Sequence, residues 1–278
     1  RQKDRTAASR NSVSCSAIAF VHALKLALAT RSRFSIMHVA VDHSTEWQDF
    51  PGVRETLERW QLIPRGSSKG AVGQLGVDVF KVIGNGKDPV KSCLGYLEKH
   101  RADLIVLAVR QLEGRMRWLG KSVGTPLAQE AGQMTLYIPL GVAGFVAPED
   151  GSVSLRNILI PVAADPRPQP AVEAAARLIR SLALPAGTIR LLHVGKPGGM
   201  PTLKLPQIAG WTWQREERPG AAADVILQEA ATVPTDLVIM TTDGPDGFLD
   251  GLRGSTSERV LSKVRCPVVS LPVGSLLG

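Results

Sequence analysis

The amino-acid sequence predicts an α/β protein of two repeated domains, each an open parallel sheet between two layers of helices. Three observations support this prediction. Short apolar strands alternate with helical segments, three strand sequences occur twice, and a polar, turn-rich stretch at 147–156 separates the copies. With 278 residues, 44% of them hydrophobic, the chain is long enough for two domains that each bury a core.

The internal repeat is visible in three pairs of strands. The pairs are FSIMHV (34–39) with IRLLHV (189–194), ADLIVLAV (102–109) with TDLVIMTT (235–242), and LYIPLGV (136–142) with VSLPVGS (269–275). The first pair is offset by 155 residues and the other two by 133, so the second copy is shorter between its second and third strands.

The two copies differ in that interval. The first copy holds VRETLERWQLI (53–63), whose Val53, Leu57, Trp60 and Leu62 recur at helical spacing. The second copy holds KPGGMPTLKLPQIAG (196–210), which is rich in proline and glycine. We expect a helix in the first copy and a loop in the second.

The second copy reads as a regular alternation of strands and helices. The predicted elements, in order, are strand NILIPVA (157–163), helix AVEAAARLIRSL (171–182), strand IRLLHV (189–194), strand WTWQRE (211–216), helix AAADVILQEAAT (221–232), strand DLVIM (236–240), helix STSERVLSKV (255–264) and strand CPVVSLP (266–272). Such an order is typical of a parallel sheet with helices on both faces.

The first copy departs from this order at its start. The segment in the place of its first strand, KDRTAASRN (3–11), is polar and basic. Either the first strand was lost with a trimmed N-terminus, or this segment forms a poor edge strand.

Several classes of protein are excluded by composition. The most apolar run, AIAFVHALKLALA (17–29), contains His22 and Lys25 and is shorter than a membrane span. The first residues, RQKDRTAASRNS, lack the apolar segment of a signal peptide. We therefore expect no membrane insertion, a trimmed or processed start, and a cytoplasmic location.

Cysteine spacing and charge point to no metal site or nucleic-acid partner. Cys15, Cys93 and Cys266 lie far apart and form no CxxC pair, which argues against disulfides and zinc. The net charge of +8 permits an anionic partner, but basic and acidic residues alternate along most of the chain. Without a nucleic-acid-binding motif, a solvated surface is the better interpretation.

The glycines near the C-terminus could bind phosphate. Gly244 follows a predicted strand, and Gly254, Ser255 and Thr256 open the next helix. Such residues let the backbone approach an anion and present free N–H groups, hydroxyls and the positive end of a helix dipole. Alternatively, Ser255 caps the helix and Glu258 completes a capping box.

With this motif the chain resembles a tandem universal stress protein (UspA family), with domains at 1–146 and 155–278. The resemblance covers nearly the whole sequence after the first dozen residues. It implies a Rossmann-like fold of the adenine nucleotide alpha hydrolase type. The family motif is G-x2-G-x9-G-[ST]; the second copy carries Thr241, Gly244, Gly254 and Ser255 at its four positions.

The first copy does not keep the motif. The same positions hold Ala108, Gln111, Lys121 and Ser122. Lys121 and three neighbouring arginines, Arg110, Arg115 and Arg117, either attract an anion or are exposed loop charges. We therefore expect the first copy to be degenerate and to bind no nucleotide.

The first strand of the second copy also departs from the family. Members carry an aspartate at its end, where this chain has Ala163. Asp165, two residues later, either reaches into the site from the loop or is a capping or solvated residue.

The resemblance implies a non-catalytic regulatory protein of the stress response that binds ATP or a related adenine nucleotide in the second domain only. The expected binding residues are Pro161, Val162, Asp165, Val194, Thr241, Gly244, Gly254, Ser255 and Thr256. The alternative is a nucleotide-free interaction scaffold, which Thr241 and Ala163 favour.

An enzyme is the least supported class. His38 and His193 recur at corresponding strand ends, which indicates shared structure more than catalysis. No HExxH or Walker A motif is present, since WLGKS has Arg115 where the first glycine belongs. Asp243 and Asp246 are the only candidate bases near the motif, and solvated turn residues are the default reading of both.

The resemblance also implies an assembly. The last strands of the two domains, in 134–142 and 266–275, should pair antiparallel within one chain and cover two sheet edges as an intramolecular pseudo-dimer. A homodimer of the whole chain is possible, and no nucleic acid or membrane partner is expected.

Overall fold

The computed structural model describes residues 5–40, 50–85, 88–111, 127, 131–242 and 256–272, the side chains from residue 17 onward. Gly244, Gly254 and Ser255 lie outside the described residues. The chain forms two compact units. Unit 1 contains Arg1–Arg101 and Val146–Val153, and unit 2 contains Ala102–Phe145 and Ser154–Gly278.

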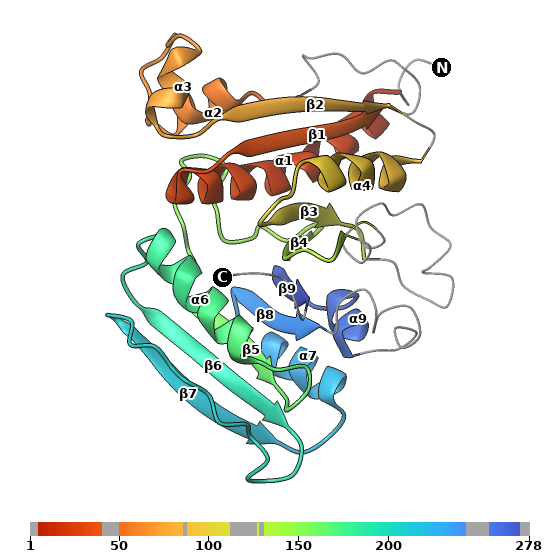
Figure 1. Cartoon of the computed structure of the whole chain (residues 1–278), viewed down its shortest axis with the longest axis vertical. Coiled ribbons are helices and arrows are strands. Elements are labelled where there is room, and N and C mark those ends of the chain that lie inside the picture. Colours follow the sequence, from red (N-terminus) through yellow and green to blue (C-terminus); the bar gives the residue numbers. More distant parts are fainter. Residues whose placement is uncertain are drawn as a thin grey trace. The chain divides into compact units, whose positions relative to one another are not determined.

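Unit 2 is built on a seven-stranded sheet (Figure 1). Its strands are β3 (Ile105–Val109), β4 (Thr135–Pro139), β5 (Asn157–Val162), β6 (Gly187–Val194), β7 (Trp211–Arg218), β8 (Leu237–Thr242) and β9 (Val268–Pro272). They lie in the order β3-β4-β9-β8-β5-β6-β7, and all neighbours are parallel except β4 and β9. The predicted parallel α/β fold is confirmed.

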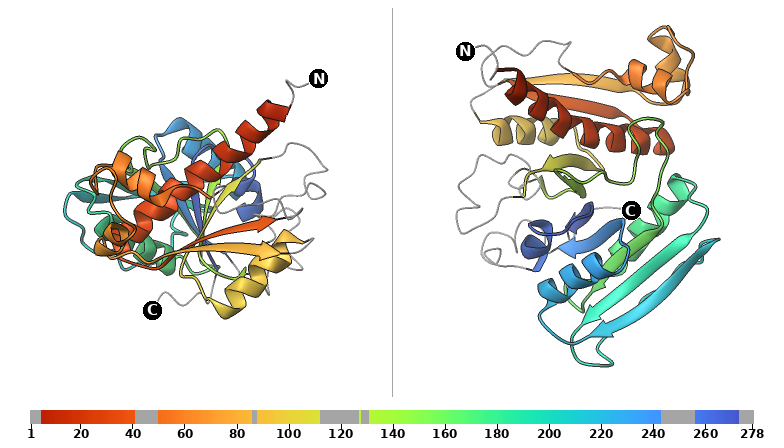
Figure 2. Two further views of the ribbon diagram at one scale, coloured as in Figure 1. Left: turned by 90° about the horizontal axis from the view of Figure 1, so that it is seen from above. Right: turned by 180° about the vertical axis from the view of Figure 1, so that it is seen from behind.

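Helices cover both faces of the five strands that the second copy contributes. They are α6 (Gln169–Ser181), α7 (Ala222–Thr232) and α9 (Thr256–Leu261). Figures 1 and 2, which view the chain from opposite sides, show α6 on one face and α7 with α9 on the other. The helices predicted for the second copy are thus confirmed, with ends that differ by at most three residues.

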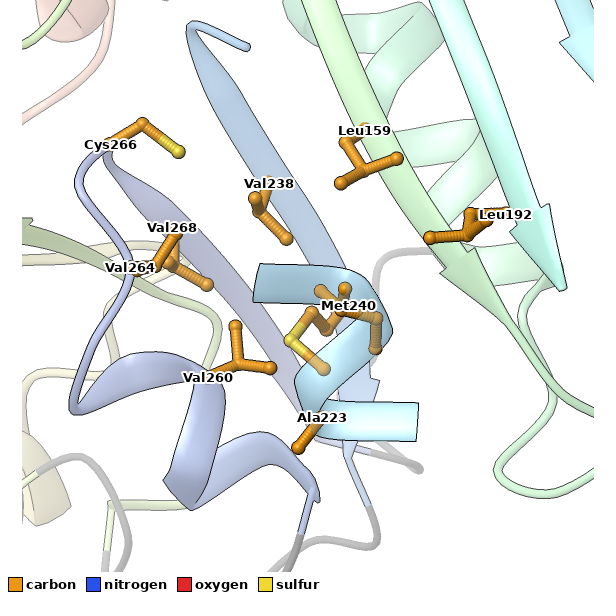
Figure 3. Packing of buried hydrophobic residues seen from close by; sticks show 10 residues of the cluster. Leu159, Leu192, Ala223, Val238, Met240, Val260, Val264, Cys266 and Val268 are labelled. Atoms are coloured by element: carbon orange, nitrogen blue, oxygen red, sulfur yellow. The ribbon is translucent and has the colours of Figure 1, made fainter. Parts of the chain in front are cut away.

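The core under α7 and α9 is aliphatic (Figure 3). Strand side chains that point to one face meet helix side chains one turn apart. The buried members of this core are Leu159, Leu192, Ala223, Ile226, Val238, Met240, Val260, Val264, Cys266 and Val268. Burying each larger aliphatic side chain contributes about 1.5–3 kcal/mol, so this layer holds the helices on the sheet. Burial also raises the pKa of the Cys266 thiol to about 12.

The other face is closed by α6, whose buried stripe is mostly alanine. Ala171, Ala175 and Ile179 recur every four residues and are at most 1% exposed. The short alanine side chains let the helix axis approach the sheet closely. The helix predicted at 171–182 is thus present at Gln169–Ser181.

The pairing between the last strands of the two copies is confirmed. β4 and β9 run antiparallel with Thr135 opposite Ser270, Leu136 opposite Val269 and Tyr137 opposite Val268. This contact continues the sheet of the second copy into β4 and β3, which belong to the first copy by sequence. The predicted domains, 1–146 and 155–278, are the two sequence copies. The compact units are instead defined by packing, so residues 102–145 of the first copy belong to unit 2.

The proline- and glycine-rich stretch 196–210 is a loop without helix or strand, as predicted. Side chains from the flanking elements hold its backbone. Trp213 donates from Nε1 to the carbonyl of Pro206 (2.9 Å), and Gln169 both donates to and accepts from the backbone of Lys204 (3.0 Å each). These hydrogen bonds hold the backbone of the loop in place without a helix.

Unit 1 contains four helices and a two-stranded parallel sheet among its described residues. They are α1 (Arg5–Thr30), β1 (Phe34–Ala40), α2 (Val53–Arg59), α3 (Gly70–Gln74), β2 (Val79–Asn85) and α4 (Pro89–Lys99). The helix predicted over 53–63 forms but ends at Arg59, so Leu62 lies outside it and is 44% exposed. Within the described parts of the chain, no helix combines the length and apolar character that crossing a membrane requires.

The start of the chain is not a poor edge strand. Residues from Arg5 onward belong to α1, so the segment at 3–11 that the repeat places at the first strand is mostly helical. Its composition explains the correction, since alanine and arginine favour a helix and no β-branched cluster is present. β1 therefore pairs with β2 alone among the residues described.

The predicted linker is docked rather than free. Val146 pairs with Val153, and the indole Nε1 of Trp60 donates to the carbonyl of Pro148 (3.1 Å). Gly151 adopts a φ of +69°, and a Cβ there would lie 2.5 Å from the Trp60 ring, so only glycine fits this turn. The turn at 147–152 is therefore part of unit 1.

His22 anchors the same turn from inside α1. Its side chain is fully buried, Nδ1–H donates to the carbonyl of Ile18 (2.8 Å), and Nε2 accepts from the N–H of Val146 (3.1 Å). The second bond requires a neutral ring. Burial lowers the pKa of His22 from 6.5 to about 4, in agreement with that requirement.

We expect acid to destabilise unit 1 through His22. The unfolded chain binds a proton as the pH falls through 6.5, whereas the folded chain does so only near pH 4. The stabilisation is therefore complete above pH 6.5 and falls by about 3 kcal/mol by pH 4. Hydrogen exchange at the amide of Val146, measured across this range, should show the loss.

The control for this experiment is His100→Gln, because His100 is exposed. His22→Gln should flatten the pH dependence of Val146 protection, and His100→Gln should leave it unchanged. Equal pH dependence in wild type and His22→Gln would show that another group titrates.

Candidate functional site

The candidate site lies at the carboxyl ends of β5, β6 and β8. The chain runs from β5 to β6 and β7 on one side, then returns to β8 on the other side of β5. The strand order thus reverses between β5 and β8, and open α/β sheets bind ligands at such a point. In the described residues β5 and β8 pair at Ile158–Leu237 and Leu159–Val238, and both strands continue for several residues beyond this pairing.

Three predicted residues come together at the ends of β5 and β6. Val162 is 3% exposed and lies opposite His193, and Pro161 lies opposite Leu192. Val194 ends β6 and packs against the aliphatic core. Pro161 and Val194 are half-buried. Because successive residues of a strand point to opposite faces, Pro161 and Val162 supply apolar side chains on both sides of the end of β5.

Thr241, which occupies the first glycine position of the family motif, lies on β8, the neighbour of β5 in the sheet. Its side chain is 8% exposed, and its hydroxyl donates to the carbonyl of Pro166 at 3.5 Å. The threonine therefore ties the end of β8 to the loop that follows β5. A glycine there would leave that space open.

The loop after β5 carries Ala163, which stands where the resemblance implies an aspartate, and Asp165. Ala163 and Asp165 are both exposed. The methyl group of Ala163 has no hydrogen-bonding atom where the family has a carboxylate. Asp165 lies at the solvent surface of the same loop.

Beyond Thr241, the phosphate part of the predicted site is described only at Thr256. Thr256 is the first residue of α9 and is half-buried. Gly244, Gly254 and Ser255 of the second copy, and Lys121 and Ser122 of the first, lie outside the described residues. The phosphate and capping interpretations of Ser255 therefore both stay open.

His193 has a structural contact that the sequence did not predict. Its Nδ1–H donates to the carbonyl of Val162 (3.0 Å) and so ties β6 to the last residue of β5. Gly195 and Gly199 surround the opposite edge of the ring, because a Cβ on either would lie 2.7 Å from Nε2. The repeat of this histidine at His38 was the available signal, and a structural role agrees with the preferred interpretation.

Glu217 holds the loop beside His193. Its carboxylate accepts from the N–H groups of Gly198 (2.8 Å) and Met200 (3.2 Å). These bonds, that of Gly198 first, hold the pKa of Glu217 below its usual value. The glycines that sequence reading assigned to a plain loop therefore form a defined rim next to the candidate site.

Gln111 of the first copy has a structural role at a motif position. Its Nε2 donates to the carbonyls of Val264 (2.7 Å) and Leu261 (3.1 Å) at the end of α9. Where the motif has a glycine for backbone approach, this chain has a side chain that caps a helix of the second copy. This contact explains why the position is not glycine.

No cluster of His, Cys, Asp and Glu suitable for a metal ion occurs within the described ranges. Burial lowers the pKa of His22 and raises the pKa values of Cys266 and Tyr137. None of the three lies among the predicted site residues, so these shifts do not indicate a catalytic group.

We expect Gln111→Ala to destabilise unit 2 by about 1–3 kcal/mol, because two carbonyls at the end of α9 lose their donor. Thermal or urea unfolding of the variant measures the loss. Gln228→Ala, an exposed substitution on α7, is the matched control and should change stability by less than about 0.5 kcal/mol. Similar stability of the two variants would mean that water replaces the amide.

Comparison with solved structures finds the same fold. A universal stress protein from Archaeoglobus fulgidus DSM 4304 aligns over 89% of this chain and 90% of its own, with a TM-score of 0.56 and 15% identity. A protein from Pseudomonas aeruginosa UCBPP-PA14, titled a putative universal stress protein, aligns over 88% and 95%, with a TM-score of 0.49 and 13% identity. A universal stress protein solved in complex with cAMP aligns over 42% and 97%, with a TM-score of 0.31 and 17% identity.

Comparison by sequence gives the family. No curated protein matches the chain. The profile described as "Universal stress protein family" matches residues 11–139 and 203–272, which is more than half of the chain and includes parts of both copies. The chain belongs to the universal stress protein family.

Proposed function

We propose that the chain is a non-catalytic regulatory protein of the stress response that binds ATP or a related adenine nucleotide in its second domain only. The domains of this proposal are those of the repeat, 1–146 and 155–278. The carrying observation is the reversal of strand order between β5 and β8, with motif residues directly after β8.

The geometry supports a division of roles. The adenine ring would contact Pro161, Val162 and Val194 at the apolar ends of β5 and β6. Asp165 would approach the ribose from the loop after β5. Phosphate groups would meet the stretch after β8, where Thr241, Gly244, Gly254, Ser255 and Thr256 lie in sequence.

The first domain would bind no nucleotide. Ala108 and Gln111 replace two glycines of its motif, and Gln111 is already engaged with α9. A glycine substitution there would both open the position and remove a cap. We therefore expect at most one equivalent of nucleotide per chain.

A nucleotide-free scaffold is the second candidate, and a specific contact favours it. The hydroxyl of Thr241, on β8, donates to the carbonyl of Pro166 in the loop after β5. Ala163 supplies no carboxylate to the site. In this alternative the rim held by Glu217 and the strand ends would contact a protein.

The remaining parts of the proposal follow the family resemblance. The chain would act in the cytoplasm, without a nucleic-acid or membrane partner. It would combine its two domains as an intramolecular pseudo-dimer, which the β4–β9 pairing supports. A homodimer of the whole chain is compatible with this arrangement.

We expect Gly254→Val to abolish ATP binding, because a β-branched side chain blocks backbone approach to phosphate. Ser255→Ala should weaken binding by about 1.5–3 kcal/mol, the value of one hydrogen bond to a charged group. Titration calorimetry with ATP measures both, and Ser154→Ala, an exposed serine of unit 2, is the control. ATP binding of equal strength in all variants would remove phosphate contact from this stretch.

We expect Thr241→Gly combined with Ala163→Asp to strengthen ATP binding. The glycine frees the space that the Thr241 side chain fills, and the aspartate offers an acceptor to ribose or adenine. The rise in melting temperature with ATP measures the gain. If the double variant shows no ATP-dependent stabilisation at millimolar nucleotide, the glycines have only a structural role in the turn, and the nucleotide-free scaffold is the better account.

A further inference from the structure

The two faces of the sheet in the second copy differ in how their charges are paired. On the side of α7 and α9, Arg190 and Arg218 both pair with Glu229 (3.2 and 3.0 Å), and Arg259 pairs with Asp224. These cations therefore have carboxylate partners within the protein. On the opposite side of the sheet, the described residues form no such pairs.

That opposite side consists of α6, the loop 196–210 and the side chains of β7 that point toward this loop, and we call it the α6 surface. Its charged residues are mostly basic. They are the cations Arg177, Arg180, Lys196, Lys204 and Arg215, and the carboxylates Glu173 and Glu217. Arg180, Lys196, Lys204 and Arg215 are exposed, and no ion pair among the described residues involves any of these four.

The loop 196–210 runs along α6, which places Lys204 beside that helix. Gln169, at the start of α6, donates to and accepts from the backbone of Lys204. Arg180, near the end of α6, donates to the carbonyl of Gln207 (3.3 Å). Contacts at both ends of the helix thus hold the loop against α6.

The strand β7 contributes Arg215 to the same surface. Trp213 donates from its indole Nε1 to the carbonyl of Pro206 in the loop (2.9 Å), so its side chain points to the loop side of the sheet. Side chains two residues apart in a strand point the same way. Arg215 and Glu217 therefore share this side, and Glu217 contacts the loop backbone as well.

The two carboxylates of the α6 surface are bonded to neutral donors. Glu217 accepts from two backbone N–H groups of the loop, and Glu173 accepts from the amide of Gln169 (3.3 Å). Neither forms an ion pair with the four exposed cations. Positive charge therefore predominates on this surface, and it attracts acidic groups.

Apolar side chains lie among these charges. Leu205, Pro206 and Ile208 of the loop are half-buried, as is Trp213, so part of each contributes to the surface. An apolar centre within a polar rim is typical of protein–protein interfaces. Single-stranded nucleic acids instead stack their bases on aromatic rings, and the Trp213 indole is already bonded to the loop. The combination favours a polypeptide partner.

We propose that the α6 surface binds an acidic, amphipathic segment of another protein. Carboxylates of the segment pair with the four exposed cations, and its apolar side chains contact the half-buried residues of the loop. Charge complementarity of this kind speeds association and selects against basic partners. None of the residues predicted to bind nucleotide belongs to the α6 surface, so this inference is independent of the proposed function.

The test uses chain 1–278 and a short fluorescent peptide in which pairs of glutamates alternate with pairs of leucines. We expect saturable binding by fluorescence anisotropy. The same peptide with glutamine in place of glutamate should bind about tenfold more weakly, because several ion pairs are lost together. Binding of the acidic peptide should also weaken as the salt concentration rises, since salt screens exposed charges.

Lys204→Glu combined with Arg215→Glu should weaken binding of the acidic peptide about tenfold, because like charges then meet. Neither side chain makes a hydrogen bond or ion pair with the described residues, so we expect the fold to be kept. The matched control is Lys263→Glu combined with Arg265→Glu, two exposed residues near the end of α9. It changes the net charge equally and should leave binding unchanged.

Equal losses in the two double variants would show that net charge alone attracts the peptide, and the proposal would be wrong. Equal binding of the acidic and glutamine peptides would indicate apolar adhesion and overturn it too. A single-stranded oligonucleotide of the same length tests the other class of polyanion. Tighter binding of the oligonucleotide, sensitive to the Lys204 and Arg215 variant, or absence of peptide binding would each refute the proposal.

Discussion

The antiparallel contact between β4 and β9 organises unit 2. It joins the last strands of two sequence copies, so two edges that would each be open become the interior of one sheet. Tyr137 lies in this contact at 5% exposure, and burial raises the pKa of its phenol far above the usual value. The parallel strands on either side of the contact then present their carboxyl ends in opposite directions. Within the second copy, the candidate ligand edge is that of β5, β6 and β8, where the strand order reverses.

β5 is the strand of the second copy that has no counterpart among the described residues of the first. In the second copy it lies between β6 and β8, where Asp236 fixes its first residues and His193 contacts its last. These two contacts fix the first and last residues of β5, Asn157 and Val162. In the first copy the corresponding position has no described strand, so β1 and β3 each pair on one side alone among the residues described. The copy that has lost the nucleotide motif is also the one in which the described residues include no counterpart of β5.

Motif glycines are replaced by side chains that make contacts of their own. Thr241 bonds to the carbonyl of Pro166, and Gln111 bonds to the carbonyls of Leu261 and Val264. Both side chains satisfy backbone acceptors in places where a glycine leaves room for a ligand. At both positions a side-chain hydrogen bond within the protein replaces the space through which a ligand could approach the backbone. Gln111 makes two hydrogen bonds of ordinary length, whereas Thr241 makes one long hydrogen bond. The motif position of the second copy is therefore less firmly occupied than that of the first.

The sequence by itself determined the repeat, the parallel strands and the helices of the second copy, because these depend on periodicity within a dozen residues. It also placed Pro161, Val162 and Val194 at neighbouring strand ends. It did not predict that 5–30 is one helix, that the turn at 147–152 packs on Trp60, or that Gln111 caps α9. Those features join groups about 90 to 150 residues apart, or depend on which strands are free to pair. Only tertiary packing decides them, because a hydrogen bond between distant residues forms only after the elements carrying them have been brought together.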